Sequence, residues 1–136
     1  SLMREFRRKI RTMARGLATL WYKRHLLNPF GYGLFAWMLW SHKLIRWLVF
    51  LAVPAALLAL ALLSLRSGVA RILLALSLLG IVLGIVAMRA PEGRRLPKPV
   101  ALAGFALASH LAGLLAWKRF FRGELNTTWE PTRRPL

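Results

Sequence analysis

The fold is decided by the stretch WLVFLAVPAALLALALLSL, from Trp47 to Leu65, which contains no charged residue. An α-helix needs about 20 consecutive apolar residues to cross the hydrocarbon core of a bilayer. Pro54 removes one backbone hydrogen bond inside this stretch, so we expect it to bend the helix. The sequence therefore predicts a first transmembrane helix at residues 47–65.

Two more apolar stretches follow, at residues 72–88 and 100–117. The link between them, Ala90 to Pro99, contains three prolines and several basic residues, so it cannot be helical throughout and must be exposed. Residues 47–117 are thus predicted to form the transmembrane region. The expected fold class is an all-α integral membrane protein, in which amphipathic interface helices are followed by about three transmembrane helices.

Residues 1–25 have a different pattern, because apolar residues recur there every three or four positions, as on one face of a helix. Arginines form a separate stripe well away from that face. A helix of this kind lies in the membrane interface with its apolar side in the acyl boundary. A soluble helix packed on a partner domain would show the same pattern. The apolar residues are Met3, Phe6, Ile10, Met13, Leu17 and Leu20, and the stripe is Arg4, Arg8, Arg11 and Arg15.

Residues 26–46 are predicted to form a turn and then a second interfacial helix. Asn28-Pro29 and Gly31-Tyr32-Gly33 are turn signals, and the apolar run after them is too short to cross a bilayer. Trp37, Trp40 and Trp47 are typical of an aromatic anchor at the level of the lipid headgroups.

The distribution of Lys and Arg predicts the orientation. Ten precede Trp47 and four lie in or next to the proline-rich link, against two between the first two spans and five in the polar tail, residues 118–136. Since basic loops stay in the cytoplasm, the amino end and the link are expected there and the tail on the opposite side. A fourth crossing near residues 30 to 45 would return the tail to the cytoplasm.

The composition excludes several classes of function. Of the 136 residues, 57% are hydrophobic. The chain also contains 21 Lys and Arg but only four acidic residues, which gives a net charge of +17. The sequence contains no recognisable nucleic-acid-binding module. We therefore expect the basic residues to bind the anionic headgroups of the bilayer and not nucleic acid. The absence of cysteine excludes disulfides and thiolate metal sites.

No catalytic or metal-binding group is predicted within the chain. The four glutamates are scattered over separate segments, and the three histidines have no ligand spacing. His110, next to Ser109, lies inside the third span, where an ionisable residue is a functional hypothesis. A neutral histidine bonded to a neighbouring helix is the alternative explanation.

Two features are candidates for sites. Guanidinium groups hold phosphate oxygens by bidentate hydrogen bonds, so the basic helix is predicted to contact lipid phosphates or a nucleotide diphosphate through Arg7, Arg8, Arg11 and Arg15. Gly80 and Gly84 have the GxxxG spacing that permits close packing of two helices, although small residues are common in membrane helices for other reasons.

Four short motifs resemble the carboxyl-terminal part of membrane-bound family 2 glycosyltransferases of the polysaccharide synthase type. They are EFRRKIRT at 5–12, Asn28-Pro29, SHKLIRW at 41–47 and TWEPTR at 128–133. In that family a cytosolic nucleotide-sugar domain sits on interface helices, and transmembrane helices follow. The resemblance implies an upstream domain that carries the catalytic aspartates and a divalent metal. The chain opens Ser1-Leu2-Met3 directly into the amphipathic pattern, as a segment of a longer protein would.

The resemblance therefore implies that this chain is the membrane-embedded region of an enzyme that transfers sugar from a nucleotide sugar to a polysaccharide or glycolipid acceptor. The chain alone is expected to be inactive. Processive members carry a QxxRW motif on an interface helix, and Arg11 matches its arginine, whereas the glutamine and tryptophan are missing here. The implied location is the cell membrane, multi-pass, in a bacterial inner membrane. The alternative is a non-enzymatic membrane protein that binds anionic lipid or a partner through its basic helix.

Overall fold

The structure is a computed structural model that describes residues 2–124, which form helices joined by short connections and contain no strand. The elements in chain order are α1 (Leu2–Tyr22), the 3₁₀ helix η1 (Arg24–Leu27), α2 (Pro29–Leu39), the π-helix η2 (Trp40–Leu44), α3 (Ile45–Ser64), α4 (Gly68–Arg89) and α5 (Lys98–Arg122). The tail beyond Glu124, with the motif at 128–133, lies outside the described residues.

The predicted fold class is confirmed. Within residues 2–124, three helical segments are long and apolar enough to cross a membrane, namely residues 29–64, α4 and α5. The helices are longer than the predicted spans, because α5 continues through Lys118 to Arg122. A helix can continue beyond the last apolar residue, because its backbone hydrogen bonds do not depend on side-chain polarity. Hydropathy predicts only the part of the helix that is apolar enough to lie in lipid.

Local sequence accounts for the ends of the helices. The Asn28 side chain accepts a hydrogen bond from the Phe30 backbone N–H at 3.0 Å, and Pro29 occupies the first turn of α2. Gly33 interrupts α2 with a φ of 51°, a conformation that favours glycine. Gly123, with a φ of 67°, ends α5.

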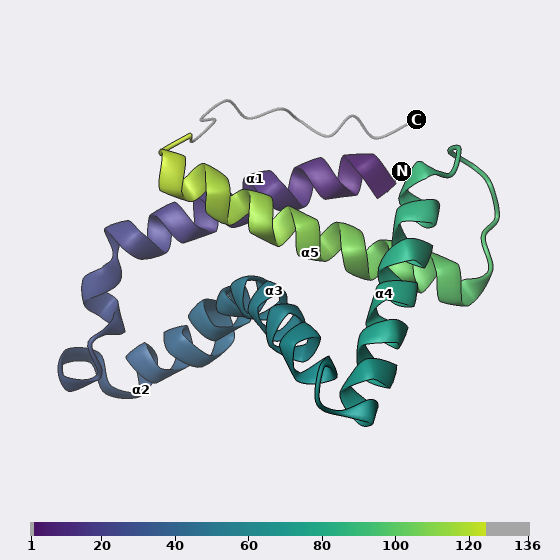
Figure 1. Cartoon of the computed structure of the whole chain (residues 1–136). Helices are drawn as coiled ribbons and strands as arrows, with labels where there is room; N and C mark the ends of the chain where they lie inside the picture. Colours follow the sequence, from purple (N-terminus) through teal and green to yellow (C-terminus); the bar gives the residue numbers. More distant parts are fainter. Residues whose placement is uncertain (1, 125–136) are drawn as a thin grey trace.

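Figure 1 shows how the helices are arranged. The helices α3 and α4 form a hairpin, and α5 lies across one end of it with α1 alongside. The buried face of α1 packs toward α5, and the buried residues of α5, which are mostly small, are shared among its contacts with α1, α3 and α4. The buried residues are Ile10, Ala14, Leu17 and Leu20 of α1, and Gly104, Ala108, Ala112, Gly113, Ala116 and Trp117 of α5.

Large apolar side chains lie on the outside of the described part of the chain. Phe30 is fully exposed, and Leu58, Leu62 and Ile72 each expose about two thirds of their surface. Soluble proteins rarely expose apolar surface on this scale. This distribution, with small residues inside and large apolar residues outside, is that of a multi-pass membrane protein whose outer surface faces lipid.

Candidate phosphate-contact surface on the first helix

The helix α1 has two faces, as its sequence period predicts. Ile10, Leu17 and Leu20 are buried, each at most 9% exposed, and they pack toward α5. The stripe of Arg4, Arg8, Arg11 and Arg15 lies on a different side of the helix, because at about 100° per residue these positions cluster well away from the direction of Ile10 and Leu17. The contacts of the apolar face thus hold α1 in place, and the guanidinium groups lie away from that contact.

The four predicted contact residues differ in their surroundings. Arg7 and Arg8 are exposed, whereas Arg11 and Arg15 are half-buried. The Nη2 atom of Arg8 donates to Oε1 of Glu5 at 2.8 Å, an exposed pair that adds little stability. Arg11 and Arg15 also have interaction partners. The four arginines thus share one helix, and Arg8, Arg11 and Arg15 follow one another along one side of it, whereas Arg7 lies about 100° around the helix from Arg8.

Lys9 makes a polar contact between α1 and α5, and sequence reasoning did not single it out. Its Nζ atom donates to Oγ of Ser109 at 2.7 Å and lies 4.0 Å from the centre of the Phe105 ring. In the sequence, Lys9 lies outside the arginine stripe and beside the apolar face of α1. This position was the one sequence feature that could have indicated a contact with a neighbouring helix. The contact joins α1 to α5 at the turn that carries Arg8 and Arg11.

His110 lies on the side of α5 that meets α3. Its ring is 5.3 Å from the ring of Phe50, centre to centre, and its Nε2 atom is buried without a hydrogen-bond partner among the described residues. Ser109 and His110, which the sequence places together, therefore face different neighbours, with Ser109 bonded to Lys9 of α1. They do not form a shared site.

The two glycines of the GxxxG spacing also have different surroundings. A Cβ atom at Gly84 would lie 2.8 Å from Cδ2 of Leu107 and 3.0 Å from the Ala103 carbonyl oxygen, both on α5. A Cβ atom at Gly80 would meet nothing within 4 Å. Gly84 thus allows the close contact of α4 with α5, whereas Gly80 faces away from any described neighbour.

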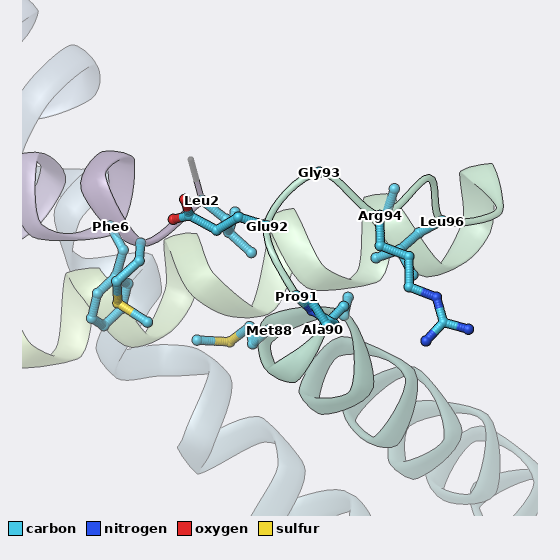
Figure 2. A pocket seen from close by; sticks show the side chains of 12 residues that line it. Leu2, Phe6, Met88, Ala90, Pro91, Glu92, Gly93, Arg94 and Leu96 are labelled. Carbon is cyan, nitrogen blue, oxygen red and sulfur yellow. The ribbon is translucent and has the colours of Figure 1, made fainter.

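A pocket of about 470 Å³ lies where the amino end of α1, the carboxyl end of α4 and the proline-rich link meet. Phe6, Met88 and Leu96 supply apolar lining, and Glu92 and Arg94 of the link supply its charges. Figure 2 shows the Glu92 carboxylate directed toward Leu2 and the Arg94 guanidinium directed away from α1. Because these two charges point apart, the pocket does not gather cations for a phosphate.

The divalent metal that the resemblance implies has no binding group in residues 2–124, where no three His, Asp or Glu side chains lie close enough to hold an ion.

The cationic face of α1 suits anions at a membrane surface rather than the membrane interior. Burying one Arg or Lys at the centre of a bilayer costs about 2.5–3.5 kcal/mol. The six cations between Arg4 and Arg15 would multiply this cost, whereas at the surface each gains roughly 1 kcal/mol from anionic headgroups. Comparisons with protein-family models, with curated proteins and with solved structures find no match for this chain.

Proposed function

We propose that this chain is the membrane-embedded carboxyl-terminal region of a family 2 glycosyltransferase, in which α1 holds the nucleotide diphosphate of the sugar donor at the membrane surface. The observation that carries the proposal is the fixed arginine row of α1. Burial of Ile10 and Leu17 together with the Lys9–Ser109 hydrogen bond sets the rotation of the helix, so the guanidinium groups project in a defined direction. Preorganised cations of this kind stabilise the charge that develops on a leaving diphosphate.

The four motifs at 5–12, 28–29, 41–47 and 128–133 support the assignment to this enzyme class. The proposed acceptor is a polysaccharide or glycolipid, and the upstream catalytic domain would supply the metal and the catalytic carboxylates. The proposed location is the bacterial inner membrane.

A second candidate function is supported by the charge alone. A non-enzymatic anchor would use the same arginines to bind anionic lipid, and a leaflet attracts charge with little regard to geometry. A diphosphate clamp needs the planar guanidinium fork, which lysine lacks. The two functions therefore make different demands on Arg11, the half-buried residue that matches the motif arginine of the family.

The test is Arg11→Lys in the full-length protein, with Arg4→Lys as the matched control in the first turn of the same stripe. For the diphosphate function we expect Arg11→Lys to lower the initial rate of sugar transfer at least about tenfold, equivalent to roughly 1.4 kcal/mol of transition-state stabilisation. Arg4→Lys should change the rate much less. The rate is measured with labelled nucleotide sugar in membranes that contain equal amounts of each variant. Unchanged rates in both variants would favour the lipid anchor.

A further inference from the structure

The helices α1 and α5 run side by side in the same direction. Lys9 contacts Ser109, and twelve residues further along α1 the ring of Trp21 lies 6.3 Å from that of Phe120, eleven residues further along α5. The contact thus extends for about 18 Å along the helix axes. Figure 1 shows the two helices following each other over this length. Any orientation that α5 takes in a bilayer is therefore shared by α1.

The named contacts of the α3–α4 hairpin with this pair lie toward one end of the hairpin. From α3 the contacts come from its first turns: the backbone oxygen of Trp47 accepts from Nε1 of Trp117 at 2.9 Å, and Phe50 packs on His110. From α4 they come from the last turns, where Gly84 and Ala87 meet α5.

The two arms of the hairpin also meet α5 at separate places along its length. Gly84 faces Leu107 and Ala87 faces Gly104, whereas Phe50 faces His110 and Gly113. A helix that crossed the bilayer parallel to α3 and α4 would meet both of them along its length. These contacts instead describe a helix set at a steep angle to the hairpin, and Figure 1 shows α5 crossing α4 in this way, closer to the carboxyl-terminal end of α4 than to its start.

We propose that α5 lies in the plane of the membrane beneath α1, on the side where α3 begins and α4 ends, and that the α3–α4 hairpin crosses the bilayer. The partner of the α1–α5 layer is the lipid surface of that leaflet. The apolar α5 lies in the acyl region and covers the apolar face of α1, and the arginines of α1 meet the headgroups. Length and composition allow α5 to cross, but α1 cannot accompany it, because six cations would enter the hydrocarbon core.

The charge distribution agrees with this arrangement. Of the 19 Lys and Arg in residues 2–124, only Arg66 and Arg71 lie between Trp47 and Met88, at the far end of the hairpin, and the other 17 come before or after this stretch. Short loops follow the positive-inside rule, so the α1–α5 layer faces the cytoplasm. The end of α5 at Glu124 is then on the same side as α1, whereas the sequence count placed the tail opposite. The inference does not depend on the proposed enzymatic function.

The absence of cysteine makes the full chain suitable for single-cysteine labelling without prior substitution. One pair of spin-labelled sites is Leu111→Cys and Lys118→Cys, both exposed on α5 and seven residues apart on nearly the same face. The matched control pair is Leu79→Cys and Val86→Cys, exposed on α4 with the same spacing. Each pair runs from near the middle of its helix toward one end, so both sites of a crossing helix would lie in the same leaflet. Depth is measured in lipid vesicles from relaxation by oxygen and by a water-soluble nickel complex.

Seven residues correspond to about 10 Å of helix. We expect the α4 pair to differ in depth by most of that length and the α5 pair by less than half of it. A depth difference in the α5 pair equal to that of the α4 pair would overturn the proposal.

A second measurement tests the sides of the membrane. In sealed vesicles, Glu124→Cys is expected to react with an impermeant maleimide from the same side as Glu92→Cys and from the opposite side to Ser67→Cys. The residue Ser67 lies between α3 and α4, and Glu92 lies in the link, so the two controls mark the two surfaces. Reaction of Glu124→Cys from the side of Ser67→Cys would show that α5 crosses and would refute the in-plane arrangement.

Discussion

Gly84→Ala should weaken the contact between α4 and α5, whereas Gly80→Ala should leave it intact. The added methyl group at position 84 would lie 2.8 Å from Cδ2 and 2.9 Å from Cβ of Leu107. Rotation of the Leu107 side chain can move Cδ2, but Cβ is fixed to the backbone. The two helices must therefore separate by several tenths of an ångström, and the contacts around the site loosen.

The magnitude follows from two opposing effects. Adding a methylene to a packed interface costs about 1–3 kcal/mol. The higher helix propensity of alanine returns at most about 1 kcal/mol. We thus expect Gly84→Ala to lower the free energy of unfolding by up to about 2 kcal/mol and to leave it about 1–3 kcal/mol below that of Gly80→Ala. A Cβ atom at Gly80 would meet nothing within 4 Å, so Gly80→Ala changes only the helix propensity of this position. The free energy of unfolding should therefore stay the same or rise slightly.

The measurement is reversible unfolding of the purified chain in mixed micelles, with SDS as denaturant and circular dichroism as the signal. Equal fractions of folded protein for Gly84→Ala and Gly80→Ala at every SDS concentration would contradict the packing described here. A loss of stability at position 80 equal to that at position 84 would have the same meaning.

Two further predictions concern single hydrogen bonds. Trp117→Phe keeps an aromatic ring but removes the N–H that donates to the Trp47 backbone oxygen, so the free energy of unfolding should fall by about 1 kcal/mol in the same assay, and an unchanged value would contradict the bond. Asn28→Ala removes the acceptor for the Phe30 N–H and should destabilise the first turn of α2 by about 1 kcal/mol, seen as faster amide exchange at Phe30, whereas Asn28→Asp should keep the slower exchange.

Periodicity identified the candidate site, but its surroundings depended on the partner helix. The arginine stripe and the apolar face of α1 repeat every three or four residues, so they can be read from the sequence alone. The burial of Ile10 and Leu17 agrees with that prediction. Nothing in residues 1–25 indicates that α5 is the helix that covers this face, because an apolar face fits lipid, a partner domain or another helix equally well.

The two glycines illustrate the same limit. Gly80 and Gly84 are equivalent in spacing, and each predicts a close approach of helices. Only the position of α5 distinguishes them, because the rotation of α4 brings Gly84 to Leu107 and leaves Gly80 open. The contact of Lys9 with Ser109 joins residues 100 positions apart, and no local pattern encodes such a distance.

The sequence by itself determined that this chain is helical and multi-pass, since lipid requires every backbone polar group to be satisfied within its own segment and since apolar length sets what can cross. It also determined the cationic face of α1. Only the tertiary structure decided which faces meet: α1 on α5, Gly84 on Leu107, and the end of the hairpin on both. Helices in lipid gain little from apolar burial, so their pairing depends on the fit of small residues and on a few polar contacts between distant positions.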